Sequence, residues 1–182
     1  MYTFHVIFSK AIFLFFDSKN DIICDVKKQL YQYFGGNIMN KLIELLNLQV
    51  ANFAVLFTKL HQYHWNVKGL RFYQFHELFE KLYDEMSENM DLIAERVLML
   101  ESTPVSTMSD FLKISSLKEG SGNESDMQMI NQVIYDLTSI DEQLKETIKV
   151  AQELDDEVTV DMLIGIDSAL QKHLWMLKSL EK

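Results

Sequence analysis

Cysteine, proline and glycine are all scarce in this chain. Its 182 residues include a single cysteine, Cys24, a single proline and six glycines. One cysteine excludes an internal disulfide framework and a cysteine-based zinc cluster, and it favours a reducing, cytoplasmic location. Because few residues break helices, the composition favours a fold rich in α-helix.

Clusters of basic residues and long apolar runs are also missing. The formal net charge is −10, which argues against a phosphate-binding surface because phosphate contacts require clustered Lys and Arg. The same charge suits a protein that attracts cations. Apolar residues make up 48% of the chain, enough for the core of one domain, yet no apolar run reaches the roughly 18–20 residues of a membrane span.

Residues 1–38 differ in composition from the rest of the chain. They hold nine of the 21 aromatic residues and the only cysteine, and no helical period is sustained among them. The codons of residues 35–38 (GGNI) can spell a ribosome-binding sequence at the usual distance from a start codon, which would be the codon of Met39. We therefore interpret residues 1–38 as a non-native or disordered N-terminal extension and residues 39–182 as the folded domain. A genuine extension of unknown role is the alternative, and native peptides from this segment in a mass spectrum would establish it.

After Met39, apolar residues recur with a period near 3.6, which predicts helices. The first helix is expected to run from about Leu42 to Val67, with Gly69 in the stop signal. The second is expected between about Phe75 and Leu100, since a helix cannot continue far past the residue that precedes a proline.

Shorter signals organise the second half of the chain. A short helix is expected over residues 108–113, a loop over residues 120–123, and a third long helix with Asn123 as its N-cap. The pair Asp155-Asp156 is expected to cap the fourth long helix. The predicted core faces of the last two helices carry Met127, Ile130, Ile134, Leu137, Leu144, Ile148, Leu163, Ile166, Leu170, Leu174 and Leu177. The pattern predicts an all-α, ferritin-like four-helix bundle with a short helix in the crossover between the second and third helices.

Metal-binding residue types share one stripe of the predicted second helix. At spacings of three, four or their sums, this stripe carries His76, Glu80, Asp84, Asp91 and Glu95. Imidazole with carboxylates suits Fe(II), and would also accept zinc or manganese. His76 and Asp91 lie about 22 Å apart along a helix that rises roughly 1.5 Å per residue, so they cannot hold the same ion. Two copies of the helix packed antiparallel across a two-fold axis would bring His76 of one chain to Asp91 and Glu95 of the other.

The alternative is a site buried inside one bundle and built from Glu-x-x-His pairs. The residues three positions before the five histidines are Tyr2, Thr58, His61, Tyr73 and Leu170. None of them is glutamate, so the sequence excludes that kind of site.

Five short segments together resemble the Dps family of mini-ferritins. They are residues 59–69 (KLHQYHWNVKG), 75–77 (FHE), 91–96 (DLIAER), 161–164 (DMLI) and 172–176 (KHLWM). The last two are similar to those of Dps-like ferritins from low-GC Gram-positive bacteria, and the resemblance covers about residue 42 to the C-terminus. One departure is visible, since many relatives have Gly-Gly after the second helix where this chain has Glu101-Ser102.

The resemblance implies a ferroxidase centre shared between subunits. By family pattern, His64 and His76 are iron ligands from one subunit, and Asp91 and Glu95 are ligands from its two-fold mate. Glu80 matches an additional acidic ligand of some relatives, and Trp65 matches an aromatic residue that intercepts oxidising equivalents. Twelve subunits would form a shell in which Fe(II) is oxidised by hydrogen peroxide or O2, ferric mineral collects, and oxidative stress is limited.

Other polar residues have a structural and a functional interpretation. His61 is either a third imidazole ligand or, the interpretation we favour, a hydrogen-bonded structural residue, and His173 is expected to pack near the end of the last helix. Asp155, Asp156, Glu157 and Asp161 serve as caps and solvated charges, or line an acidic pore through which Fe(II) enters, as the resemblance favours.

Two other functions compete with iron storage. One is a shell that protects DNA by binding it; the other is a metal-free structural shell, against which the intact ligand set argues. From Met39 onward there are 13 Lys and Arg against 24 Asp and Glu, with no basic tail. We therefore expect a homo-oligomer that binds neither DNA nor a membrane.

Overall fold

The computed structural model describes residues 21–181, and the side chains of residues 35–180. The chain divides between Gly36 and Asn37, and the second unit, residues 37–182, contains the helical bundle described below. Helix α2 spans Asp21–Asn66, so the prediction that the first helix begins after Met39 was wrong. No proline lies between residues 21 and 39, and the two glycines there cost a helix only about 1 kcal/mol each, which allows it to continue. The part of the expected N-terminal extension before residue 21 lies outside the described residues.

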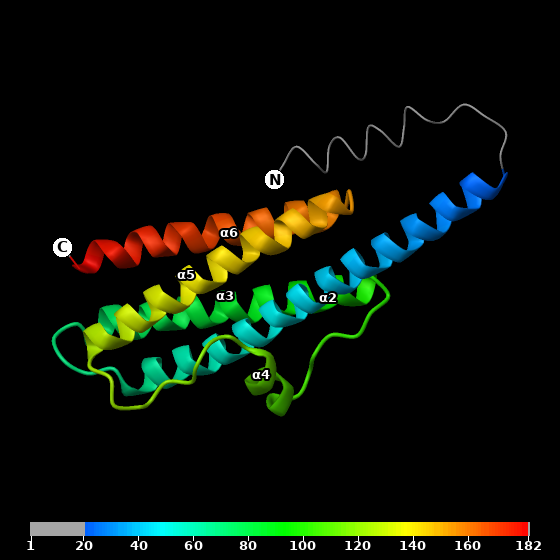
Figure 1. Ribbon diagram of the computed structural model, residues 1–182. Coiled ribbons are helices and arrows are strands. Elements are labelled where there is room, and N and C mark those ends of the chain that lie inside the picture. The colour runs from blue at the N-terminus through cyan, green and yellow to red at the C-terminus, as the bar shows by residue number, and fades with distance from the viewer. Residues whose placement is uncertain (1–20, 182) are drawn as a thin grey trace. The chain divides into compact units, whose positions relative to one another are not determined.

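The remaining described elements are all helices, as the composition predicted (Figure 1). They are α3 (Phe72–Met99), the short α4 (Met108–Ile114), α5 (Asp126–Glu153), α6 (Glu157–Lys178) and the 3-10 turn η1 (Ser179–Glu181). Figure 1 shows α4 within the long connection between α3 and α5, where the sequence placed a short helix. The prediction of an all-α bundle with a helix in its crossover is confirmed for the part of the chain from Asn37 on.

Contacts between the helices fix the topology of the bundle. Helices α2 and α5 run antiparallel, since Lys59 pairs with Asp136 while Asn52, further back in α2, bonds to Gln143, further on in α5. Arg96–Thr159 and Glu85–His173 likewise make α3 and α6 antiparallel. Because α2 and α3 are joined by a short turn and are also antiparallel, α3 and α5 point the same way. The connection between them must therefore return along α3, whose 28 residues span about 42 Å.

The crossover is held to α2 by asparagine side chains. The Asn47 side chain accepts a hydrogen bond from the backbone N–H of Val105 at 2.8 Å. One turn and a half further along α2, the Oδ1 of Asn52 accepts from the N–H of Ser116 at 2.9 Å. These bonds satisfy backbone groups that would otherwise be left without partners where the loop covers the core.

The helix ends follow standard capping chemistry with one correction. The N-cap of α5 is Ser125, which forms a capping box with Gln128, and the prediction of Asn123 was wrong by two residues. Asp156 caps α6 as predicted, since its side chain accepts from the N–H of Thr159. After α3, Glu101 adopts a left-handed φ of 57°; its N–H donates to the carbonyl of Leu98, and the N–H of Ser102 donates to the carbonyl of Val97.

The interior of the bundle is apolar and is filled from all four long helices. All five predicted core residues of α6 are buried, and on α5 Ile130, Leu137 and Leu144 are buried. The segment Gly35–Asn66 of α2 is long and apolar enough to cross a membrane by length and composition. Many of its apolar side chains, such as Phe53 and Leu56, are fully buried in the bundle, and the core helix of a globular protein can pass the same test.

Candidate metal centre

Two histidines face each other where the end of α2 meets the start of α3. The rings of His64 and His76 are stacked, with centroids 3.6 Å apart and planes at 19°. The Nδ1 of His64 lies 2.9 Å from the carbonyl oxygen of His76, and the Nδ1 of His76 lies 2.8 Å from the carbonyl oxygen of His64. The two residues therefore lock each other in place across the antiparallel pair of helices.

These reciprocal bonds determine the tautomer of both rings. A carbonyl oxygen only accepts hydrogen bonds, so each Nδ1 must carry the proton and donate it. In the neutral ring, Nε2 then keeps its lone pair. A backbone carbonyl bound to one imidazole nitrogen is the arrangement that orients the other nitrogen toward a metal. The two residues can thus present two Nε2 ligands.

The acidic residues of the stripe lie on the exposed face of α3. The side chains of Glu80, Asp91 and Glu95 are all exposed to solvent. Among the described residues, no three His, Cys, Asp or Glu side chains come together closely enough to hold a metal ion. The structure therefore brings His64 and His76 together and leaves Asp91 and Glu95 on the same helix but several turns away.

Ring contacts of His61 and Tyr83 extend the histidine pair along the contact between α2 and α3. The His61 ring stacks on Tyr83 at 3.8 Å, and Tyr83 meets His64 edge-on at 5.4 Å. The Nδ1 of His61 is 3.1 Å from the carbonyl oxygen of Phe57, which fits the structural role we favoured. Burial, followed by the charges of Glu80 and Asp84, raises the pKa of the Tyr83 phenol above its ordinary value.

Trp65 lies at the open end of this row. Its indole is 69% exposed and contacts the His61 ring at 5.3 Å. It also lines a cavity of about 290 Å³ with residues of α2, α4 and the crossover, including Met108 and Leu112. Both of these side chains are largely exposed, so the surface around Trp65 is apolar.

The acidic residues at the start of α6 do not share one environment. Asp156 bonds to Arg96 at 2.7 Å and to Thr159. Burial would raise the pKa of Asp156, but the bonds from Arg96 and Thr159 outweigh it and lower that pKa. Glu157 and Asp161 are exposed instead. Asp156 is therefore committed to a salt bridge and a helix cap, whereas the other two are free to meet solvent cations.

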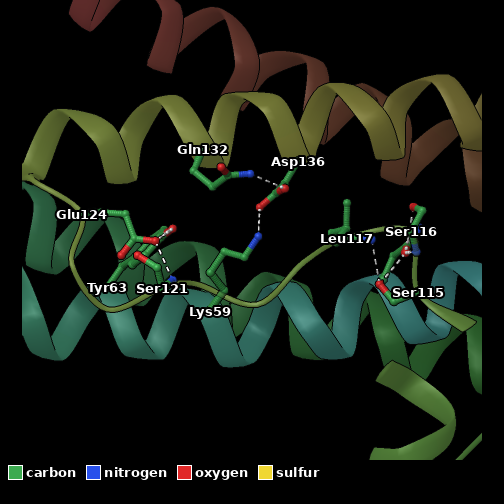
Figure 2. A network of polar contacts seen from close by, with 10 residues as sticks. Lys59, Tyr63, Ser115, Ser116, Leu117, Ser121, Glu124, Gln132 and Asp136 are labelled. Carbon is green, nitrogen blue, oxygen red and sulfur yellow. Dashed lines mark hydrogen bonds and ion pairs between the residues drawn. The ribbon is translucent and has the colours of Figure 1, made fainter. Parts of the chain in front are cut away.

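A second polar cluster lies inside the bundle, on the opposite side of α2. Figure 2 shows the Lys59 side chain reaching from α2 to Asp136 on α5, at 2.5 Å. Both side chains are only 1% exposed, and Gln132 donates to the other Asp136 oxygen at 3.0 Å. Burial raises the pKa of Asp136, an effect that Lys59 and Gln132 counteract. One turn along α2, the Tyr63 hydroxyl donates to Glu124, which also accepts from the N–H of Ser121 (Figure 2).

Sequence reasoning missed Tyr83, Lys59 and Asp136, and it gave His173 a packing role only. Tyr83 lies seven residues after His76, on the same face of α3, so its spacing was a readable signal. His173 was expected to pack, yet its Nε2 pairs with Glu85 at 2.7 Å and joins α6 to α3. Lys59 and Asp136 carry no local signal, because their partnership depends on how α2 and α5 pack.

Comparison with known proteins places these features in context. The family model described as a ferritin-like domain matches residues 43–182. DNA protection during starvation protein 2 of Bacillus anthracis is 46% identical over 142 residues, covering 78% of this chain and 97% of that protein.

Solved structures give the same picture. The crystal structure of a Dps protein from Bacillus brevis is 44% identical, with a TM-score of 0.79 over 80% of this chain and 98% of that one. A Dps protein from Vibrio cholerae O1, described as a member of a broad superfamily of ferritin-like diiron-carboxylate proteins, is 27% identical. Its TM-score is 0.78, over 80% of this chain and 92% of that one.

Proposed function

This chain belongs to the Dps family of ferritin-like proteins, and from that membership we propose that it oxidises Fe(II) and stores the ferric product. The oxidant is hydrogen peroxide or O2, and the product collects inside a shell of twelve copies. Peroxide is consumed in the reaction, which protects the cytoplasm against oxidative stress.

The observation that carries this proposal is the stacked pair of His64 and His76. Their backbone hydrogen bonds hold both Nδ1 atoms as donors and leave both Nε2 atoms available. Neutral imidazole nitrogen is a good ligand for Fe(II), and it requires carboxylate partners to neutralise the charge of the ferric product. Iron is the substrate and the cargo of this site.

The carboxylates come from a second copy of the chain. Asp91 and Glu95 are too far along α3 to reach the ion held by His64 and His76 of the same chain. An antiparallel two-fold contact between two α3 helices brings Asp91 and Glu95 of each copy to the histidines of the other, and creates the site twice. Glu80, one turn after His76, is placed to assist either iron ligation or the approach of cations.

Entry of Fe(II) uses exposed acidic side chains. Glu157 and Asp161 on the first two turns of α6 would repeat around a three-fold axis of the shell and form a negatively charged pore. Asp156 supports that pore by its salt bridge with Arg96, which fixes the start of α6.

Iron oxidation is tested by mixing two defective variants. Fe(II) is added without oxygen, then hydrogen peroxide, and ferric absorbance is followed. We expect His64→Ala/His76→Ala to lose at least about 100-fold in rate, and Asp91→Ala/Glu95→Ala to do the same. Glu142→Ala, at an exposed acidic residue of α5, is the matched control and should keep the wild-type rate.

Shells reassembled from equal amounts of the two double variants test the shared site. If the two variants pair at random, half of the pairs are mixed, and one of the two sites in each mixed pair has intact histidines and intact acids. About one site in four is then complete, so about a quarter of the wild-type rate should return. No recovery would place the ligands of each ion within one chain. Undiminished rates in both separate variants would remove the ferroxidase proposal altogether.

Protection of DNA by direct binding is a second candidate, because the relative from Bacillus anthracis is named for DNA protection. The net charge of −10 opposes it, since binding to phosphates depends on Lys and Arg. We expect no retardation of plasmid in a gel at physiological salt, and clear retardation would support DNA binding as an added function.

A further inference from the structure

A polar cluster joins α3 to α6 on the side of α3 that is turned away from the proposed iron centre. The Nε2 of His173 on α6 lies 2.7 Å from the Oε2 of Glu85 on α3. Glu85 follows His76 by nine residues, which is about 2.5 turns of a helix, so the two side chains leave α3 on opposite faces. His76 meets α2, whereas Glu85 meets α6. The cluster therefore belongs to neither the histidine pair nor the acidic stripe.

Two atoms of this cluster are buried without a partner. Within residues 35–180, the Oε1 of Glu85 and the Nδ2 of Asn89 have no hydrogen-bond partner. Asn89 is only 9% exposed and lies one turn after Glu85, on the same face of α3. Native interiors contain few such atoms, and a bound water molecule or ion is the usual reason for one. An acceptor and an amide without partners, next to an imidazole, therefore indicate a ligand at this place.

The residue types fit a divalent transition-metal cation. An imidazole nitrogen with a carboxylate suits Zn(II), Fe(II) and related ions. Rotation of the Asn89 amide by half a turn exchanges Nδ2 and Oδ1, which offers a carbonyl oxygen as a third donor. Ligands bound at about 2.0–2.2 Å to one ion lie about 3 Å from each other. The pair of His173 and Glu85 would therefore have to open by only a few tenths of an ångström.

The cluster is also open enough to be reached by a cation. The side chains of His173 and Glu85 are 21% and 27% exposed. An ion can therefore enter from solvent and keep water molecules as its remaining ligands. It takes the place of the proton that Nε2 shares with Glu85. In the neutral ring this proton moves to Nδ1, which leaves the lone pair of Nε2 for the metal.

We infer that His173, Glu85 and Asn89 form a binding site for a divalent transition-metal cation of the Zn(II) and Fe(II) class, between α3 and α6 of one chain. Unlike the proposed iron centre, this site needs no second copy of the chain. The inference goes beyond the proposed oxidation of iron and does not rest on it. Because the folded chain binds the ion and the unfolded chain lacks the site, the metal also stabilises the contact between α3 and α6.

The test measures Zn(II) binding to the full chain by titration calorimetry, in the variant His64→Ala/His76→Ala, which lacks the histidines of the proposed iron centre. We expect about one Zn(II) per chain to bind through the imidazole of His173. In this background, His173→Gln and Glu85→Gln should each weaken the binding at least tenfold. Lys172→Gln, at an exposed position beside His173, is the matched control and should leave the affinity unchanged.

A variant that gains affinity separates a metal ligand from a packing residue. Asn89→Asp places a second carboxylate one turn from Glu85, so without metal it should lower the urea midpoint, because like charges repel each other. With Zn(II), the added carboxylate should raise the affinity at least fivefold. Loss of packing alone cannot produce this increase. This variant and Glu85→Gln also decide the question if His173→Gln does not fold.

Three results would overturn the inference. One is unchanged Zn(II) affinity in His173→Gln and Glu85→Gln, and another is no gain of affinity in Asn89→Asp. The third is no Zn(II) binding at all in the background variant, which would leave an ordered water molecule as the occupant of the cluster. Because the background lacks His64 and His76, a failure of the wild type to oxidise iron would not affect these results.

Discussion

Two polar clusters arise from the same two turns of α2 and differ in nearly every physical respect. In the inward cluster, Lys59 of α2 and Asp136 of α5 are sealed from water and paired, and the buried Tyr63 donates to Glu124 of the crossover (Figure 2). The outward cluster, made of His61, His64 and Trp65 with Tyr83 and His76 on α3, has ring nitrogens left available. The ammonium and the carboxylate of the inward pair are occupied in holding α2 to α5, whereas the Nε2 atoms of His64 and His76 remain available for chemistry.

The cost of each cluster explains this division. A buried charge must be paired, because leaving it without a partner costs several kcal/mol. The three imidazoles of the outward cluster are only half-buried, and water can solvate an unused lone pair on such a ring at little cost. A metal ligand must have an available lone pair, so the outward face of α2 is where a site can form.

Breaking the inward cluster should have the largest effect on stability. Lys59→Ala leaves the Asp136 carboxyl buried without its cation, and we expect a loss of about 3–5 kcal/mol in the free energy of unfolding, measured by urea denaturation. His64→Ala, in the outward cluster, should cost less than about 1 kcal/mol while it abolishes iron oxidation. Equal losses in the two variants would contradict the division between the clusters.

The double variant Lys59→Met/Asp136→Leu isolates the charge from the packing. It replaces both charged groups by apolar ones of similar size, so it should recover most of the stability that Lys59→Ala loses. Lys41→Ala breaks the ion pair with Glu146, in which both side chains are at least half exposed, and it should change stability by no more than about 0.5 kcal/mol. A loss in the double variant as large as that in Lys59→Ala would assign the effect to packing.

A second interior pair, between α5 and α6, sharpens the comparison because it consists of two acids. Burial, then the hydrogen bond and charge of Asp141, raises the pKa of Asp167 to about 6. Burial would raise the pKa of Asp141 as well, but bonds from Lys145, Asp167 and Gln171 outweigh it and lower that pKa. A single proton shared between the two carboxyls explains why the pKa of Asp167 is raised while that of Asp141 is lowered. The Oδ1 atoms of both residues are buried and have no hydrogen bond to any other group that the structure describes.

This pair predicts a pH dependence of stability with a definite sign. Because the folded pKa of Asp167 lies above its ordinary value, the stability that it contributes is full below about pH 4 and is lost as the pH rises through about 6. Asp167→Asn keeps a hydrogen-bond donor toward Asp141 and should be more stable than the wild type by about 1 kcal/mol at pH 7.5, with no gain at pH 4. Asp161→Asn, on the exposed side of α6, is the control, and a gain for Asp167→Asn that did not depend on pH would rule out the shared proton.

The smallest expected effect lies outside both clusters, at the end of α3. Glu101 holds a left-handed φ of 57°, which costs a residue with a side chain about 1 kcal/mol, and its charge lies at the negative end of the helix dipole. Glu101→Gly should therefore raise the free energy of unfolding by roughly 0.5–1 kcal/mol. Glu101→Gln removes only the charge, so it separates the effect of the helix dipole from that of the backbone strain. If Glu101→Gly were less stable than the wild type, the Glu101 side chain would make a contact that outweighs the strain.

Much of the fold was predictable because it depends on local pattern. The 3.6-residue period of apolar side chains gave four long helices, and proline and glycine placed the breaks near Gly69 and Pro104. The N-cap of α5 was predicted wrongly because two candidates have nearly equal energies. Asn123 and Ser125 are both good N-cap residues, and only the reciprocal hydrogen bond with Gln128 favours Ser125. The start of α2 was predicted wrongly because two glycines destabilise a helix too little to end it.

The candidate site was only partly readable from the sequence. Spacing singled out His76, Asp91 and Glu95 as candidate ligands, and the resemblance added His64. Helix geometry showed only that His76 and Asp91 of one chain cannot hold the same ion. The stacked orientation of the histidines and the contact of Tyr83 with His61 depend on the register between α2 and α3, which no local pattern encodes.

The sequence by itself therefore determined the helices, their apolar faces and the set of metal-binding residue types, since each follows from neighbours along the chain. Only the tertiary structure decided which polar residues face each other: Lys59 with Asp136 inside, and His64 with His76 and Tyr83 outside. The reason is that one turn of α2 presents side chains to both faces of the helix, and packing alone determines which face is sealed.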